Sequence, residues 1–211
     1  MDTDISKMFK DKNKEIFKNS LTLEIERNLE TLKNTTDNCV ALEINKLFLF
    51  FKKYFQEIEI EYKKEELLGI LYKERKDIND IVNKKIEEKK ERIKTNFLAK
   101  ENKEEILTTD FLDSYYNELI NETKKINEEI ELEVSKEITT IFSSKIIKKY
   151  KLESIEQSER IHSRIDILFK NNIIQRVKEQ IEFRDESLKN IAMESFNKYI
   201  ELNKNTIEQN S

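Results

Sequence analysis

The chain has 211 residues with 39 basic and 43 acidic side chains, no proline or tryptophan, and a single glycine, cysteine and histidine. This composition excludes sheet-rich folds, which need turn residues between many short strands, and disulfide scaffolds, which need paired cysteines. The formal net charge of -4 is small and apolar residues recur regularly, which argues against intrinsic disorder. The sequence therefore predicts an all-α protein without a sheet. Its bias toward isoleucine, lysine and asparagine is typical of an AT-rich genome.

The first predicted helix covers about residues 4–33. Its apolar residues recur three, four and seven positions apart and form one broad stripe, namely Ile5, Met8, Phe9, Ile16, Phe17, Leu21, Ile25, Leu29 and Leu32. The Asn, Thr and Asp side chains of residues 34–38 compete with the helical backbone for hydrogen bonds. We expect the helix to end there, at the strongest internal boundary of the chain.

A second helix is predicted from about residue 38 to 62. One side carries Val40, Ile44, Leu47, Phe48, Phe51, Tyr54, Phe55 and Ile58. Leu49 and Phe50 extend the apolar surface around most of the circumference, which is typical of a central helix or an interface helix. Residues 57–62 and 129–134 alternate like strands, but both lie within helical periodicity and are predicted to be helical.

Further helices are predicted at 63–98, at 110–150, at 154–171 and from about 173 to 202. The lone Gly69 interrupts the first of these and could mark a close helix crossing or a bend. Ser154 and Gln157 have the spacing of a capping box, and Asn171–Asn172 is a candidate break. Arg184, Ser195 and Lys198 interrupt the last apolar seam, so a continuous coiled coil is not secured.

The predicted architecture is a single helical domain over residues 1–211. It contains five or six long antiparallel helices, partly bundle and partly coiled-coil-like. A subdivision is expected near 100–109, between 1–100 and 110–204, and residues 205–211 should fray.

Catalytic motifs are almost absent. Phosphate-binding loops need several glycines, and a nucleophile–histidine pair can be built only from Cys39 and His162. Cys39 is placed at a predicted helix start, where the helix dipole could lower its pKa, although a small buried thiol is the simpler interpretation. Glu159 and His162 have the spacing of di-iron ligands, but no second histidine exists to complete such a site. We therefore predict no enzyme activity, no cofactor and no metal.

Two clusters of charge stand out. Lys84, Lys85, Lys89, Lys90, Arg92 and Lys94 crowd one predicted helix, interleaved with three glutamates. Glu122, Glu129, Glu133 and Glu137 lie near one face of another. This second cluster could bind a cation or a basic partner, and a solvated helix face is the alternative.

These observations predict a non-enzymatic interaction protein, such as a scaffold, adaptor, inhibitor or regulator. It would bind a protein partner and form a homo-oligomer, with a dimer as the first expectation. The predicted partner-binding residues are Leu49, Phe50, Lys53, Lys85, Lys89 and Arg92. The alternatives are a nucleic-acid-associated factor that uses a dimer-aligned basic helix face, and a peripheral membrane-binding protein. The isoelectric point near 5.5 disfavours the first. No secretory signal or membrane span is visible, so we expect a cytoplasmic protein.

Overall fold

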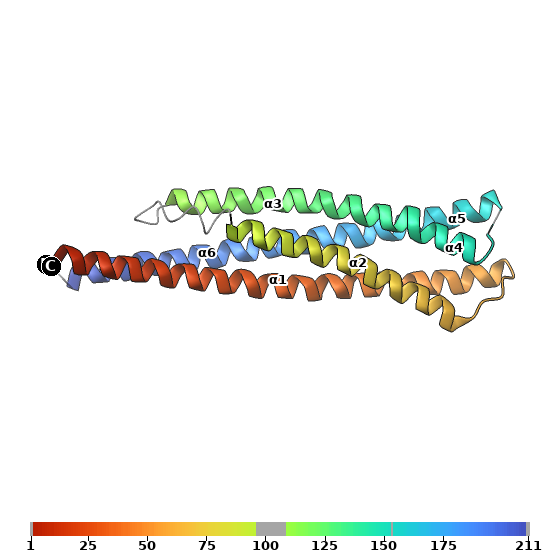
Figure 1. Ribbon diagram of the computed structural model, residues 1–211, viewed down its shortest axis with the longest axis horizontal. Helices are drawn as coiled ribbons and strands as arrows, with labels where there is room; N and C mark the ends of the chain where they lie inside the picture. The colour runs from red at the N-terminus through yellow and green to blue at the C-terminus, as the bar shows by residue number, and fades with distance from the viewer. Residues whose placement is uncertain (1, 96–108, 153, 210–211) are drawn as a thin grey trace. The chain divides into compact units, whose positions relative to one another are not determined.

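The computed structural model describes residues 2–95, 109–152 and 154–209, and every regular element in these ranges is a helix (Figure 1). The elements are α1 (Asp2–Glu57), α2 (Lys64–Ile93), α3 (Thr109–Lys136), η3 (Glu137–Phe142), α4 (Ser143–Lys149), α5 (Ile155–Asp166), η4 (Ile167–Ile174) and α6 (Gln175–Gln209), where η denotes a π-helical segment. The prediction of an all-α protein is confirmed. Within the described ranges, no helix is both long and apolar enough to cross a bilayer.

The boundary predicted at residues 34–38 is wrong, because α1 continues through it. Thr36 is buried and its hydroxyl donates to the Lys33 carbonyl at 2.9 Å. The Asp37 carboxylate accepts hydrogen bonds from Arg75 and Asn79 of α2. These polar side chains find partners that leave the helical backbone intact, so tertiary contacts override their low helix propensity.

The break predicted at residues 171–172 is also absent. The chain instead forms the π-helical segment η4, and the Asn172 side chain donates to Glu43 Oε2 of α1 at 3.1 Å. With both predicted breaks removed, the described helices join into four continuous runs rather than five or six: α1, α2, α3–η3–α4 and α5–η4–α6.

Both π-helical segments coincide with an unusual spacing of buried residues. Around η3 the buried positions are four apart, at Ile126, Ile130, Val134, Ile138, Phe142 and Ile146, and around η4 they are again four apart, at Ile161, Ile165, Phe169, Ile173, Val177 and Ile181. In an α-helix each step of four residues rotates the side chain by about 40° beyond a full turn. The wider π turn rotates less per residue, so it counters this drift and keeps the two series facing the core. The rings of Phe142 and Phe169 meet there at 6.3 Å.

Two helices end in the same left-handed turn. After α1, Glu59 has φ 55°, and the amide of Ile60 donates to the Phe55 carbonyl at 2.9 Å. After α4, Lys151 has φ 51°, and the amide of Leu152 donates to Ile147 at 3.0 Å. This is the Schellman pattern, which normally uses glycine at the left-handed position. Residues 58–63 therefore form a connection, and the prediction that 57–62 is helical is wrong for every residue after Glu57.

Two other local predictions are confirmed, and two are not. Residues 129–134 lie within α3, and the Ser154 hydroxyl accepts the Gln157 amide hydrogen at 3.1 Å to cap α5. Gly69 marks no close crossing, because no atom lies within 4 Å of the place where its Cβ would be. The subdivision expected near 100–109 falls almost entirely outside the described residues, and α6 continues to Gln209 through the tail that was expected to fray.

Contacts divide the chain into two compact units. The first comprises residues 1–31, 87–124 and 182–211, and the second comprises 32–86 and 125–181. In the first, Phe17 packs against Phe196 and Tyr199, and Lys94 of the run that begins with α2 pairs with Glu26 of α1 at 2.5 Å. In the second, Leu47, Phe51 and Phe55 of α1 are fully buried together with Leu67 and Leu71 of α2, among others.

Candidate functional site

Three of the predicted partner-binding residues, Leu49, Phe50 and Lys53, line a groove between α1 and α5 in the second unit. The groove has a volume of about 650 Å³, and its other lining residues are Lys46, Tyr54, Glu57, Arg160, Ser163, Arg164 and Ile167. The opposite side of the same α1 turns, at Leu47 and Phe51, is fully buried. Helix α1 is therefore apolar on both sides for two reasons: one side is core, and the other forms this groove.

Two aromatic rings in the groove stack on each other, and an arginine lies over each of them. The ring of Phe50 stacks on Tyr54 with centroids 5.6 Å apart and planes 9° apart. The Arg164 guanidinium lies 5.5 Å from the Phe50 ring, and the Arg160 guanidinium lies 4.6 Å from the Tyr54 ring. Arg160 also pairs with Glu57 at 2.8 Å. Burial raises the pKa of the Tyr54 hydroxyl, and Arg160 opposes that shift.

The groove combines exposed apolar surface with positive charge. Leu49 is 62% exposed and Ile167 is 47% exposed. Four cationic side chains line the groove, at Lys46, Lys53, Arg160 and Arg164, against the single carboxylate of Glu57. The chain as a whole is negatively charged, so this local excess of cations stands out.

The other three predicted residues, Lys85, Lys89 and Arg92, do not form an exposed basic face. Lys85 pairs with Glu129 at 3.1 Å and with Glu133 at 2.8 Å. Arg92 Nε pairs with Glu122 at 3.1 Å. Lys85 and Arg92 of the basic cluster are therefore paired with three glutamates of the acidic cluster within the chain. Both clusters can be recognised in the sequence, and their opposite charges are the sequence feature that could have predicted this pairing.

Lys89 lies inside the first unit and is 1% exposed. Its ammonium donates to Asp185 Oδ1 at 2.5 Å and to the Thr123 hydroxyl at 2.8 Å, and Thr123 also hydrogen-bonds Asp185. Burial lowers the pKa of Lys89 and raises that of Asp185, and the attraction between the two groups opposes both shifts. Because the Lys89 side chain is only 1% exposed, this arrangement is a buried ion pair and not part of an exposed basic face.

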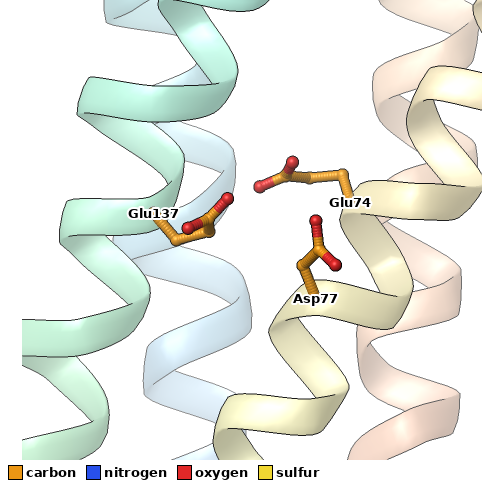
Figure 2. A group of neighbouring side chains, drawn as sticks. All are labelled: Glu74, Asp77 and Glu137. Carbon is orange, nitrogen blue, oxygen red and sulfur yellow. The ribbon is translucent and has the colours of Figure 1, made fainter.

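Three carboxyl groups form a cluster that could hold a metal ion. Glu74 and Asp77 of α2 and Glu137 of η3 each place one oxygen within 4.8 Å of the others, and Figure 2 shows their side chains converging on one point. Sequence reasoning had placed Glu137 in the acidic cluster but had not singled out Glu74 or Asp77.

The two remaining candidates for chemistry find no support. Cys39 lies in the middle of α1 rather than at a helix start, and burial raises the pKa of its thiol, which disfavours the reactive thiolate. Glu159 and His162 are both exposed on α5. Neither belongs to a cluster of metal-ligand type among the described residues.

Comparisons with protein-family models, with curated proteins and with solved structures find no match to this chain.

Proposed function

We propose that this protein is a non-enzymatic helical interaction module whose α1–α5 groove binds an acidic amphipathic helix of a partner protein. The observation that carries the proposal is the exposure of Leu49 and Ile167 in a groove that four cationic side chains surround. An apolar groove commonly receives the apolar face of a helix, with side chains three and four positions apart as anchors. Glutamates beside those anchors would meet the groove's lysines and arginines.

Arg164 supports an acidic partner in particular. Its guanidinium lies over the Phe50 ring, and it has no ion pair with any residue that the structure describes. Lys46 and Arg160 already contact Glu43 and Glu57, but their side chains are 42% and 53% exposed and remain accessible to a second carboxylate. Arginine suits this role because its planar guanidinium binds a carboxylate and stacks on an aromatic ring at the same time.

The test uses two labelled helical peptides with the same apolar residues, one with glutamates and the other with lysines on its flanks. We expect fluorescence anisotropy to show at least about tenfold tighter binding of the acidic peptide, equivalent to about 1.4 kcal/mol. The difference should shrink as salt screens the charges. Leu49→Glu should abolish binding, because it places a carboxylate at the centre of the groove.

Leu132→Glu is the matched control, because Leu132 is an exposed leucine of α3 that does not line the groove. Equal binding of the two peptides, or a Leu49→Glu protein that binds like the Leu132→Glu protein, would contradict the proposal. Binding to single-stranded RNA or to anionic vesicles, without binding to either peptide, would support one of the alternative functions instead. The internal pairing of Lys85, Lys89 and Arg92 gives the basic-face alternative no structural support.

A cytoplasmic location and a homo-oligomer, with a dimer as the first expectation, remain part of this proposal.

A further inference from the structure

The second unit contains two almost fully buried glutamates with very different surroundings. Glu43 contacts Lys46 at 2.8 Å and Arg176 at 3.6 Å, and it accepts a hydrogen bond from Asn172. Glu74 is just as buried, at 1% exposed, yet its Oε1 atom has no hydrogen-bond partner among the described residues. Buried polar atoms are nearly always satisfied, so this carboxyl oxygen is open to a partner from outside the chain, which is either a water molecule or an ion.

The position of Glu74 indicates what that group is. Its carboxyl group points toward Glu137, and Asp77 lies beside it, one turn along α2 (Figure 2). Oxygen ligands lie 2.0–2.6 Å from Mg²⁺ or Ca²⁺, so two ligands of one ion are at most about 5 Å apart. The separations of up to 4.8 Å in this cluster meet that limit without any movement of the backbone. Glu137 opens a π-helical segment, and such segments are frequent at functional sites.

Both carboxyl groups and ammonium groups surround Glu74, which also lines a cavity with Lys73, Lys145, Lys148 and Lys149. Burial is the largest cause that raises its pKa, to about 8, and the charges of Glu137 and Asp77 add to the shift. Lys145 of α4 and Lys73 of α2 oppose it. Lys145 lies 3.8 Å from Glu137 and its side chain is 43% exposed, so its ammonium can move away when another cation arrives.

We propose that Glu74, Asp77 and Glu137 bind one hard divalent cation, of the class of Mg²⁺, Mn²⁺ and Ca²⁺, with water completing the coordination. The ion joins α2 to η3 within the second unit. This site is separate from the groove, whose lining contains none of the three residues. It reverses our sequence-based expectation of no metal.

The test adds MgCl₂, MnCl₂ or CaCl₂ separately to the metal-free full chain at pH 6 and pH 8, with thermal unfolding and isothermal titration calorimetry as readouts. We expect a stoichiometry of one ion per chain for at least one metal, with a Tm that rises with its concentration because only the folded state binds it. Binding should be tighter at pH 8, because Glu74 must lose its proton to act as a ligand. The three metals separate a site of the magnesium and manganese type from one that favours calcium.

Glu74→Gln and Asp77→Asn keep the side-chain shapes and should each weaken binding by at least about tenfold. Glu65→Gln, an exposed position on the same helix, is the control and should bind as the original chain does. Lys145→Ala should tighten binding, because it removes the competing ammonium. No saturable binding of any of the three metals at pH 8, or equal binding by the Glu74→Gln and Glu65→Gln proteins, would overturn the proposal. The groove variant Leu49→Glu should bind metal normally, so this proposal and the proposed function can fail independently.

Discussion

Glu43, Glu74 and Lys89 are each about 1% exposed, but different contacts surround their charges. Glu43 and Lys89 have partners of opposite charge, at 2.8 Å and 2.5 Å respectively. Glu74 instead faces two further carboxyl groups. A buried charge is tolerated only when it is paired or neutralised, so these residues should respond differently to pH and to substitution.

The stability of the metal-free protein should fall as the pH rises from about 5 to 8. The Glu74 carboxyl has a pKa of about 8 in the folded chain, against an ordinary value of 4.5. The folded state therefore holds this proton more tightly than the unfolded state does, and its stability declines over that interval by up to about 1.4 kcal/mol per pH unit. Urea unfolding with a chelator present measures the slope. Glu74→Gln should flatten it, and an unchanged slope in that variant would show that another group titrates.

Replacing Lys89 with methionine should cost about 3–5 kcal/mol, because the buried Asp185 carboxylate would lose its cation. The double variant Lys89→Met/Asp185→Leu should recover much of this loss, because no unpaired charge remains. Lys94→Met is the comparison, since Lys94 forms an ion pair of the same length with the more exposed Glu26, and its effect should be much smaller. Chemical denaturation checks all three. A small loss for Lys89→Met would mean that water reaches Asp185.

At the scale of the helices, periodicity predicted most of the regular structure, whereas local propensity failed at particular places. The segment 34–38 is helical because Asp37 finds Arg75 and Asn79, 38 and 42 residues further along the chain. The residues next to this segment in the sequence do not indicate such distant partners. The turn after α1 was missed for another reason: its left-handed residue is Glu59, whereas the usual sequence signal there is glycine. The π-helical segments did have a signal in the sequence, namely the sustained four-residue spacing of apolar residues.

The two Schellman turns should gain stability from glycine. The left-handed conformation costs a residue other than glycine about 1–2 kcal/mol of folding free energy. Glycine avoids this cost, but it loses more conformational entropy on folding, which offsets part of the stabilisation. We expect Glu59→Gly and Lys151→Gly each to stabilise the protein by about 0.5–1 kcal/mol.

The reverse exchange, Gly69→Ala, should also stabilise the protein by about 1 kcal/mol, because Gly69 lies within α2 with open space around it. Urea midpoints measure all three, and a lower midpoint in any of them would contradict the reasoning for that position.

At the scale of the molecule, the sequence predicted three of the ten residues that line the candidate groove, all of them on α1. Leu49, Phe50 and Lys53 were found because the circumference of one helix was too apolar. Arg160 and Arg164, more than a hundred residues away, were not found, because only the fold brings α5 beside α1. The same limit applies to the carboxyl cluster. In the sequence, Glu74 and Asp77 are two of many acidic residues on a charged helix. The cluster exists only because the fold places Glu137 of η3 next to them.

The predicted homo-oligomer can be tested at the groove. If a second copy of the chain occupies it, Phe50→Glu should lower the mass measured by light scattering to that of a monomer, while circular dichroism keeps its helical signal. Phe50 is only half-buried, so we expect the helices to persist. Leu132→Glu is again the control. A dimer that survives Phe50→Glu would place the contact between copies elsewhere and leave the groove to another partner.

The π-helical segments also have a consequence for variation in chain length. A one-residue deletion in a regular helix turns everything after it by about 100°, which would move one series of core residues toward solvent. A π turn accommodates a surplus residue, so a deletion inside it can be absorbed by a return to α-helical geometry while the flanking helices keep their phase. Removing the exposed Thr140 of η3 should therefore leave a folded protein, whereas removing the exposed Lys125 of α3 should not. Thermal unfolding of the two deletion variants measures the difference. In natural variants of this chain, we expect single-residue insertions and deletions within helices to concentrate in η3 and η4.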